Sequence, residues 1–280
     1  MIKGRAIEER SSDKMIDSAY VVSLTSPTAT NISLFGAKAA NLAKAAQLGF
    51  SVPDGLVVSK KCTEDEFALI AKAILDELYP PVAVRSSATK EDSETKAFAG
   101  QFETRLGINT VANLKEAFSI VKGSGASEHV KSYNGGVIPK NEVAVLVQRM
   151  VDATRAGVAF SKDPVTGESK VIIDSNYGLG KSVVDGDVTP DSIEYSSDGT
   201  VNTYVGRKSI QIALDDNGIH VKDTPAADAD RCSLSTEEIK EVANLAQRVE
   251  RDLGFVADIE WAFDTEGILW LLQARPITTI

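Results

Sequence analysis

The stretch Asp258-Ile-Glu-Trp-Ala-Phe-Asp264 alternates polar and apolar residues, and Leu269-Trp-Leu-Leu-Gln-Ala-Arg275 follows it with polar residues again two positions apart. A period of two is that of a β-strand with one buried face and one polar face. Two such strands joined by a turn predict an antiparallel hairpin. We therefore expect the chain to close with a hairpin that is apolar on one side and charged on the other.

Four side chains belong to the charged side of this hairpin: Asp258, Glu260, Gln273 and Arg275. If the connecting loop has an even number of residues, Asp258 falls opposite Gln273 and all four groups meet, whereas an odd loop separates them. Carboxylates and an amide oxygen suit Mg²⁺, and a guanidinium can hold phosphate oxygens bidentately. The alternative is the solvated polar face of a two-layer sheet, and the spacing alone favours neither.

The composition is that of an ordinary globular protein with one or two domains: 280 residues, 43% apolar and 25% charged. The formal net charge of −10 disfavours non-specific binding to nucleic acid or to anionic membranes. No apolar stretch is long enough to span a membrane, and the first ten residues lack the apolar core of a secretory signal. The two cysteines indicate neither a disulfide framework nor a thiolate metal site, so we expect a cytoplasmic location.

A second polar feature lies in the first half of the chain. A short predicted strand, Val82–Arg85, ends in an arginine and opens into the polar run Ser86–Ser93. Hydroxyls and backbone N–H groups in such a loop can surround a phosphate, and Gly100 beyond it permits close approach of a ligand. An ordinary surface loop is the commoner outcome for this local pattern. Because residues 86–101 contain little apolar material before Phe98, we expect a mobile loop that could cover a bound phosphate.

Lys38 is a third feature. It lies at the opening of an Ala-rich helix predicted from Gly36 to Leu48, where a positive side chain is electrostatically unfavourable unless an anion binds beside it. A solvent-facing lysine is the commoner outcome. The sequence lacks the Gly-x-x-x-x-Gly-Lys-Ser/Thr pattern of a P-loop, so any phosphate site here is of another kind.

The two halves of the chain differ in their patterns. Capping boxes at Thr63/Glu66 and Ser235/Glu238 predict helices. The run Val143–Val147 is apolar throughout, as in a strand that is covered on both faces. Helices are expected mainly before residue 150 and antiparallel strands mainly after it.

Five blocks of sequence, taken in order, resemble the nucleotide-binding domain of phosphoenolpyruvate synthase, pyruvate phosphate dikinase and rifampicin phosphotransferase. The blocks are Gly36-Ala-Lys-Ala-Ala-Asn-Leu42 with Gly49-Phe-Ser-Val-Pro-Asp-Gly55; Val84-Arg-Ser-Ser-Ala88 with Glu91-Asp92 and Phe98-Ala-Gly-Gln101; Val147-Gln-Arg-Met-Val151 with Ala156-Gly-Val158 and Asp163-Pro-Val-Thr-Gly167; Tyr177-Gly-Leu-Gly180 with Val183-Val184 and Val188-Thr-Pro-Asp191; and Asp258-Ile-Glu260 with Leu272-Gln-Ala-Arg-Pro276. Any single block would be weak, but the ordered series covers residues 20–279 and is specific.

The resemblance implies an α/β (α+β) fold that is ATP-grasp-like, with two subdomains enclosing a nucleotide cleft. We expect a flexible N-terminal arm at residues 1–17, an N-terminal subdomain at 18–150 and a C-terminal subdomain at 151–280. The change of pattern near residue 150 agrees with this division.

The resemblance also implies roles for individual residues. Lys38, Arg85 and Arg275 match the family's phosphate-contacting, catalytic positions. Glu260 and Gln273 match its metal-associated positions, and the strand leading to Gln148-Arg-Met-Val151 matches the hinge that carries the adenine. The full set expected to bind ATP is Lys38, Arg85, Ser86, Thr89, Gly100, Gln101, Gln148, Met150, Val151, Asp258, Glu260, Gln273 and Arg275.

The implied activity is that of an ATP-dependent phosphotransferase with ATP and Mg²⁺ as cofactors. Relatives continue into a domain with a phosphorylatable histidine, which this sequence lacks, so we expect transfer to a histidine on a separate domain or subunit with AMP as product. The alternatives are an autonomous small-molecule kinase or ligase, and a nucleotide sensor without turnover. No nucleic-acid or membrane partner is expected, and the sequence does not identify the acceptor.

The sequence departs from the family pattern within the same blocks. Lys181 stands where the family commonly has glutamate after Gly-Leu-Gly. The stretch between Val58 and Val82 is shorter than the usual helical insertion, and the spacing from Glu260 to Gln273 is one residue longer than expected.

Overall fold

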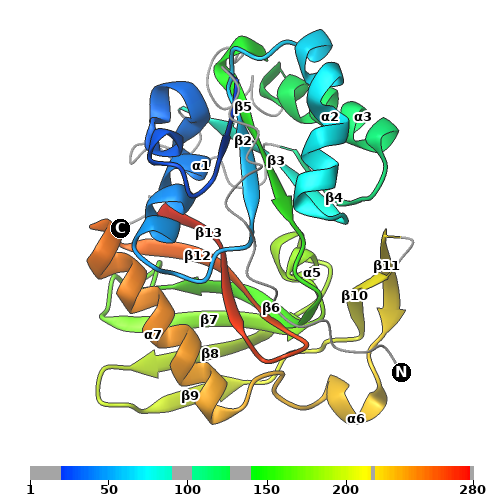
Figure 1. Cartoon of the computed structure of the whole chain (residues 1–280). Coiled ribbons are helices and arrows are strands. Elements are labelled where there is room, and N and C mark those ends of the chain that lie inside the picture. Colours follow the sequence, from blue (N-terminus) through cyan, green and yellow to red (C-terminus); the bar gives the residue numbers. More distant parts are fainter. Residues whose placement is uncertain (1–19, 90–102, 127–139, 216–217, 278–280) are drawn as a thin grey trace.

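The structure, a computed structural model, describes residues 20–89, 103–126, 140–215 and 218–277. Most of its strands belong to two antiparallel sheets, the upper and lower groups of strands in Figure 1. In spatial order, the N-terminal sheet contains β1 (Val21–Ser23), β2 (Gly55–Val58), β5 (Val143–Arg149), β3 (Val82–Ala88) and β4 (Thr104–Ile108). The C-terminal sheet contains β13 (Leu269–Pro276), β12 (Ala257–Asp264), β6 (Ala153–Phe160), β7 (Lys170–Tyr177), β8 (Asp191–Ser196) and β9 (Val201–Tyr204). A separate hairpin is formed by β10 (Ile210–Asp215) and β11 (Gly218–Asp223).

The apolar run Val143–Val147 becomes the middle strand of the N-terminal sheet, as its sequence predicts. Each of its five side chains is at most 1% exposed, because helices cover both faces. On one face, side chains of α2 (Glu64–Leu78) and α3 (Val111–Gly123) form a hydrophobic cluster with the sheet. On the other face, α1 (Ile32–Gln47) packs against Leu146. The two-sided cover explains why this strand does not alternate.

Both helices predicted from capping boxes are present. At the start of α2, the Thr63 hydroxyl accepts from the Glu66 N–H, and the Glu66 carboxylate accepts in return from the Thr63 N–H. Ser235 and Glu238 form the same pair of bonds before α7 (Thr236–Leu253). Helix α7 lies along one face of the C-terminal sheet (Figure 1) and leaves the other face to the cleft described below.

Helix α1 packs against both sheets. The hydrophobic cluster that includes Leu42 of α1 also contains Leu146 of the N-terminal sheet and Trp261 of the C-terminal sheet. The Asn41 side chain donates to the Ala274 carbonyl oxygen at 3.5 Å. The chain moves from one sheet to the other between Arg149 and Ala153, where the sequence places its division. Because α1 shares its core with both sheets, the division at residue 150 stays a proposal about folding units.

Two local predictions need correction, one in α1 and one in β3. Helix α1 begins at Ile32, before the predicted start, but Gly36 interrupts it with φ 76° and ψ 167°, so its regular part begins where the sequence predicts. Strand β3 continues to Ala88, so Ser86 and Ser87 are fully buried and do not open a polar loop. The physical reason is a bond across the fold, since the Ser87 hydroxyl accepts from the Ala39 N–H at 3.0 Å and caps the regular part of α1.

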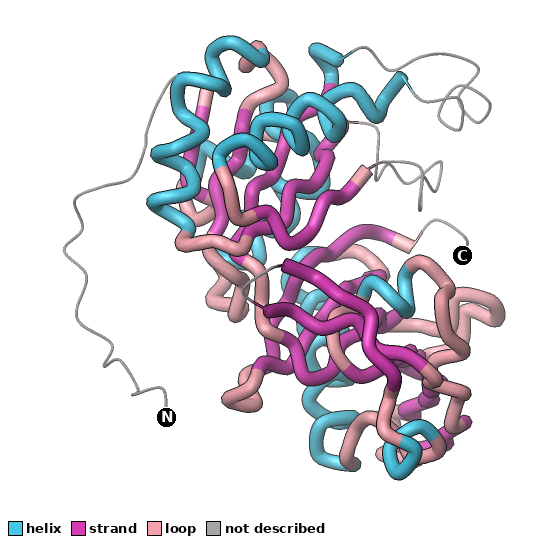
Figure 2. Tube along the Cα trace, turned by 90° about the vertical axis from the view of Figure 1, so that its right-hand side faces the viewer, coloured by secondary structure: helices cyan, strands magenta, loops and turns pink. Residues whose placement is uncertain are grey.

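The predicted mixed α/β fold is confirmed, and Figure 2 shows the strands of the two sheets as separate groups from the side. Over the ranges that the structure describes, no helix is long and apolar enough to cross a membrane. The predicted arm at residues 1–17 lies outside the described residues.

Candidate functional site: the cleft between the two sheets

A cleft of about 710 Å³ lies between the N-terminal and C-terminal sheets. Its N-terminal wall includes Lys38, Arg85, Thr104, Leu106 and Gln148. Its C-terminal wall includes Val158, Asp174, Asp258, Glu260, Gln273 and Arg275. The link between the sheets, with Met150 and Val151, closes one end. Most of the predicted site residues therefore line a single cavity.

Arg85 connects the two walls. From β3 its Nη1 donates to Glu260 Oε2 on β12 at 2.8 Å and lies 3.4 Å from Gln273 Oε1 on β13. The two charged side chains are only 11% and 20% exposed, so water screens this ion pair less than a surface pair. Arg85 Nε is buried without a hydrogen-bond partner among the described residues. A buried donor in this state is rare in proteins, and it marks Arg85 as a candidate functional residue.

The charge of Glu260 depends on the basic residues around it. Burial by itself would raise the pKa of Glu260, but the charge and hydrogen bond of Arg85 outweigh burial, with further help from Arg275 and Lys38. The pKa of Glu260 therefore lies below its ordinary value. The carboxylate is kept ionised at neutral pH and can act as a ligand for a cation.

Asp258 and Arg275 form a second ion pair on the same wall. Arg275 Nε and Nη2 each lie 2.8 Å from Asp258 Oδ2, which fixes the plane of the guanidinium. Burial raises the pKa of Asp258, and the charge of Arg275 opposes that shift. This pair lies on the same face of the hairpin as Glu260, so the four polar residues predicted from alternation do meet.

The register within the hairpin differs from the prediction by two residues. Asp258 lies opposite Arg275, and Glu260, not Asp258, lies opposite Gln273. Parity, and not the particular partner, decides the face, so the shift leaves all four side chains in the cleft. A β-bulge then changes the pairing between Glu260 and Trp261, because Trp261 pairs with Leu271. Leu272 is the extra residue of this bulge on β13.

Lys38 reaches the cleft from the first turn of the regular part of α1. Its residue is 8% exposed, and its charge contributes to lowering the pKa of Glu260. The position depends on Gly36, where a Cβ would lie 2.0 Å from the Ser87 carbonyl oxygen. The close approach of α1 to β3 therefore brings Lys38 and Arg85 onto the same wall.

Some groups of the hinge, residues 148–151, already form hydrogen bonds with other parts of the protein. The Arg149 N–H donates to the Asp54 carbonyl at 2.8 Å, and the Met150 N–H donates to the Pro81 carbonyl at 3.1 Å. The Gln148 side chain is 2% exposed, and its Nε2 lies 3.4 Å from the Pro53 carbonyl oxygen. Because these N–H groups already have partners, we expect a bound base to form its hydrogen bonds with the Val151 N–H and with carbonyl oxygens of the same segment.

Two further predicted residues that the structure describes, Ser86 and Thr89, do not line the cleft. Ser86 is fully buried within β3, so its side chain does not reach the cavity, contrary to the prediction. Thr89 is also absent from the lining, and its Oγ1 is buried without a partner among the described residues. Gly100 and Gln101 lie outside the described residues, as does most of the loop expected to cover the phosphates.

Several charged residues of the cleft were not among the predicted site residues, including Glu103, Arg149, Asp174, Lys181 and Asp185. Asp174 lies on β7, and Lys181 and Asp185 lie on α5 (Lys181–Val184) and directly after it. Burial raises the pKa of Asp174, and a hydrogen bond with Ser192 opposes that shift. Lys181 forms an ion pair with Asp185 one turn later. The available signal for Asp174 was a carboxylate that directly follows the apolar pair Ile172 and Ile173.

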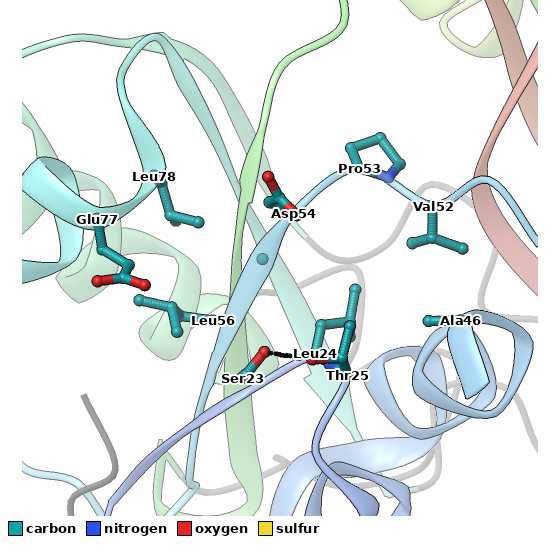
Figure 3. A pocket seen from close by; sticks show the side chains of 11 residues that line it. Ser23, Leu24, Thr25, Ala46, Val52, Pro53, Asp54, Leu56, Glu77 and Leu78 are labelled. Carbon is teal, nitrogen blue, oxygen red and sulfur yellow. Dashed lines mark hydrogen bonds between the residues drawn. The ribbon is translucent and has the colours of Figure 1, made fainter. Parts of the chain in front are cut away.

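A second, smaller hollow of about 190 Å³ lies beside β2 (Figure 3). It is lined by Ser23, Leu24, Thr25, Ala46, Val52, Pro53, Asp54, Gly55, Leu56, Glu77 and Leu78. None of these described lining residues is basic, so the hollow offers no counter-charge to phosphate. It adjoins the hinge through Asp54, whose carbonyl accepts from Arg149.

The donor set of the cleft fits Mg²⁺ bound together with a phosphate ligand. Among the described residues, no group of three or more His, Cys, Asp or Glu side chains is arranged to hold a metal ion alone. Mg²⁺ commonly takes one or two carboxylates and completes its octahedron with substrate phosphates and water. The Glu260 carboxylate and the Gln273 amide oxygen, both directed at the Arg85 cation, are suitable protein ligands for such an ion.

Comparison with known proteins agrees with this geometry. The family model described as "Pyruvate phosphate dikinase, AMP/ATP-binding domain" matches residues 63–280. An uncharacterized phosphotransferase, YvkC of Bacillus subtilis, is 34% identical over 281 residues, which cover 88% of this chain and 34% of that protein. A probable phosphoenolpyruvate synthase of Methanothermobacter thermautotrophicus is 36% identical over 227 residues, which cover 76% of this chain and 31% of that protein.

A solved structure, D-alanyl-alanine synthetase A from Vibrio cholerae, matches with a TM-score of 0.40 and 12% identity over 86% of this chain and 58% of that one. The chain spans about a third of the length of the curated relatives that it matches. The matched residues 63–280 include Arg85 on one wall of the cleft and the whole polar hairpin on the other. The chain belongs to the family of pyruvate phosphate dikinase AMP/ATP-binding domains.

Proposed function

We propose that the chain binds Mg-ATP in the cleft and acts as the phosphate-donating component of a dikinase-type phosphotransferase. The β,γ-phosphates of ATP pass to a histidine on a separate domain or subunit, for onward transfer to an acceptor. The histidine nitrogen forms a bond to the β-phosphorus while the bond from that phosphorus to the α,β-bridging oxygen breaks. AMP leaves with the electron pair of that oxygen.

One observation carries this proposal: basic residues from both walls converge on one carboxylate–amide pair. Lys38 and Arg85 come from the N-terminal wall, and Arg275 comes from the C-terminal wall. With Asp258 and Glu260 they form a cluster that is positive overall, in a chain whose net charge is −10. A local positive charge in an acidic protein favours an anionic ligand at that place.

The site residues have separable tasks in this proposal. Arg85 and Lys38 bind phosphate oxygens, and Arg275, oriented by Asp258, neutralises the charge that develops on the transferring phosphates. Glu260 and Gln273 would hold Mg²⁺, which offsets phosphate charge when bound. Glu260 is the partner of Arg85 in the structure, and a phosphate oxygen would take its place when the nucleotide binds.

The family supports the donor role but not the identity of the acceptor. The relatives named above are a phosphotransferase and a probable phosphoenolpyruvate synthase, each about three times as long as the matched part. We expect the acceptor to bind to another domain or subunit, because the described cleft is lined by groups that suit the nucleotide.

The test combines binding with product analysis. Calorimetry with Mg-ATP measures whether the chain binds the nucleotide at all. The chain is then incubated with Mg-ATP, with and without the histidine-bearing domain of a family relative, and the nucleotide products are separated. AMP that forms only with the histidine domain supports the proposal. ADP formed with a small acceptor alone would indicate a direct kinase or ligase, and tight binding without any turnover would indicate a nucleotide sensor.

A further inference from the structure

A row of side chains crosses the cleft face of the C-terminal sheet and ends at a carboxylate outside the phosphate cluster. Gln273 lies opposite Glu260, Glu260 opposite Val158, and Val158 opposite Asp174. Directly opposed residues of antiparallel strands point to the same face, so Asp174 faces the cleft as Glu260 does. With strands about 4.8 Å apart, Asp174 lies about 10 Å from Glu260, with only Val158 between them.

The ends of a bound nucleotide define where its sugar lies. The inference rests on the proposed function, in which the base meets the hinge at Val151 and the phosphates meet Arg85, Glu260 and Arg275. Strand β6 starts at Ala153, beside the hinge, and runs towards Phe160, which lies opposite Asp258. The sugar therefore sits over the middle of β6, near Val158.

The direction of the sugar follows from its chemistry. The 5′-carbon of a ribose carries the phosphates, and the 2′- and 3′-hydroxyls lie on the opposite edge of the ring. Because the phosphates lie towards β12 and β13, the hydroxyls point along the sheet towards β7, where Asp174 lines the cleft. Val158 is the single side chain between Glu260 and Asp174 in the row, so the way from one carboxylate to the other along the sheet is open.

Asp174 has the chemistry that a vicinal diol requires. An ionised carboxylate only accepts hydrogen bonds, and its two oxygens match two neighbouring hydroxyl donors. A second phosphate group at this place would be repelled by the carboxylate, whereas a neutral diol would not. Ser192 lies directly across from Asp174 on β8, and its hydroxyl favours the ionised form of the carboxylate.

We propose that Asp174 is the sugar-recognition residue of the cleft, which binds the 2′- and 3′-hydroxyls of the nucleotide and makes the site selective for ribonucleotides over deoxyribonucleotides. The pairing of a carboxylate with ribose hydroxyls is a general solution for nucleotide sugars. It gives a task to a charged cleft residue that neither the phosphates nor the metal would use.

The test compares three nucleotides on three proteins. Mg-ATP, Mg-2′-deoxyATP and Mg-3′-deoxyATP are titrated into the parent chain, into Asp174→Asn and into Glu194→Gln. Glu194 is a matched control, because it is a carboxylate on β8 that pairs with Lys170 and does not line the cleft. We expect the parent to bind ATP about tenfold more tightly than either deoxynucleotide, the size of one hydrogen bond to a charged group.

In Asp174→Asn, ATP should lose about tenfold in affinity and the preference should fall to within about twofold, while Glu194→Gln behaves as the parent does. Thermal unfolding of each variant verifies that the fold is intact. Equal binding of all three nucleotides by the parent would overturn the role of Asp174 and leave the proposed function standing. A preference that survives in Asp174→Asn would do the same. Failure of the parent to bind any nucleotide would instead refute the proposed function.

Discussion

Arg85 Nη1 and Glu260 Oε2 lie 2.8 Å apart although 175 residues separate them in the sequence. Arg85 is held by the N-terminal sheet and Glu260 by the C-terminal sheet. Each half of the chain therefore contributes only part of the site. The pair also connects the two walls of the cleft, so the response of the protein to Mg-ATP should begin there.

Glu260→Gln removes the charge of the carboxylate but keeps its shape and an acceptor for Arg85. We expect Mg²⁺ to lose most of its strengthening effect on ATP binding, and Mg-ATP affinity to fall by about tenfold or more, as for loss of one charged ligand. ATP without Mg²⁺ should bind as well as before or better, because a nearby negative charge is gone. Calorimetry with Mg²⁺ and with a chelator measures both quantities. An unchanged Mg²⁺ dependence would contradict the assignment of Glu260.

Gly36→Ala tests the close approach that brings Lys38 to the cleft. The new Cβ would lie 2.0 Å from the Ser87 carbonyl oxygen, and the residue has φ 76°. We expect a loss of about 3 kcal/mol or more in unfolding free energy, together with weaker ATP binding. Urea denaturation and calorimetry measure these changes.

Gly49→Ala is the matched control for that variant. Gly49 also has φ 76°, but a Cβ there would meet nothing within 4 Å. The control should therefore cost only about 1 kcal/mol, the strain of a positive φ, and leave ATP binding intact. Similar losses in the two variants would mean that the contact with Ser87 has little importance.

Local patterns predicted the parts of this protein that depend on neighbouring residues. The closing hairpin follows from alternation, β5 from a continuous apolar run, and the helices α2 and α7 from their capping boxes. The shared polar face of Asp258, Glu260, Gln273 and Arg275 was predictable for the same reason. Their register was not, because the connecting loop and the bulge at Leu272 set it.

What the sequence could not reveal depends on contacts between distant segments. Ser87 reads as part of a polar loop, yet it is buried because it caps a helix 48 residues away. Asp174 reads as an isolated carboxylate, and it reaches the cleft only through the pairing of β6, β7 and β12. The meeting of Arg85 with Glu260 depends on how the two sheets pack, which no local pattern encodes.

Lys208→Met should be among the most destabilising changes outside the cleft. Lys208 Nζ lies 2.6 Å from Asp191 Oδ1, and both side chains are 0% exposed. Asp191 also accepts from the N–H groups of Gly206 and Ser233, so removal of the lysine leaves a buried carboxylate without its counter-charge. We expect a loss of about 3–5 kcal/mol, measured by urea denaturation.

A double-mutant cycle separates the pair from its surroundings. The double variant Lys208→Met/Asp191→Asn should lose less unfolding free energy than the two single variants lose in sum, because it contains no unpaired buried charge. Lys72→Met, which breaks the exposed pair with Asp76, should cost no more than about 0.5 kcal/mol. Simple additivity in the buried cycle would argue against coupling of Lys208 and Asp191.

Asp163→Asn should show a stability cost that depends on pH. Asp163 Oδ1 accepts from the N–H groups of Val165 and Thr166 at 2.9 and 3.1 Å, and the carboxylate also pairs with Lys170. These backbone bonds lower the pKa of Asp163 from 3.8 to about 2. Since the folded pKa is below the unfolded pKa, the ionised group stabilises the fold above about pH 4, and this contribution is lost as the pH falls from about 3.8 towards 2.

The urea midpoint of Asp163→Asn should therefore fall below that of the parent at pH 7, and the gap should narrow at pH 3. Asp230→Asn, at an exposed site, provides the charge-matched control with no such gap. A gap of the same size at both pH values would show that the carboxylate charge of Asp163 is not what stabilises the turn.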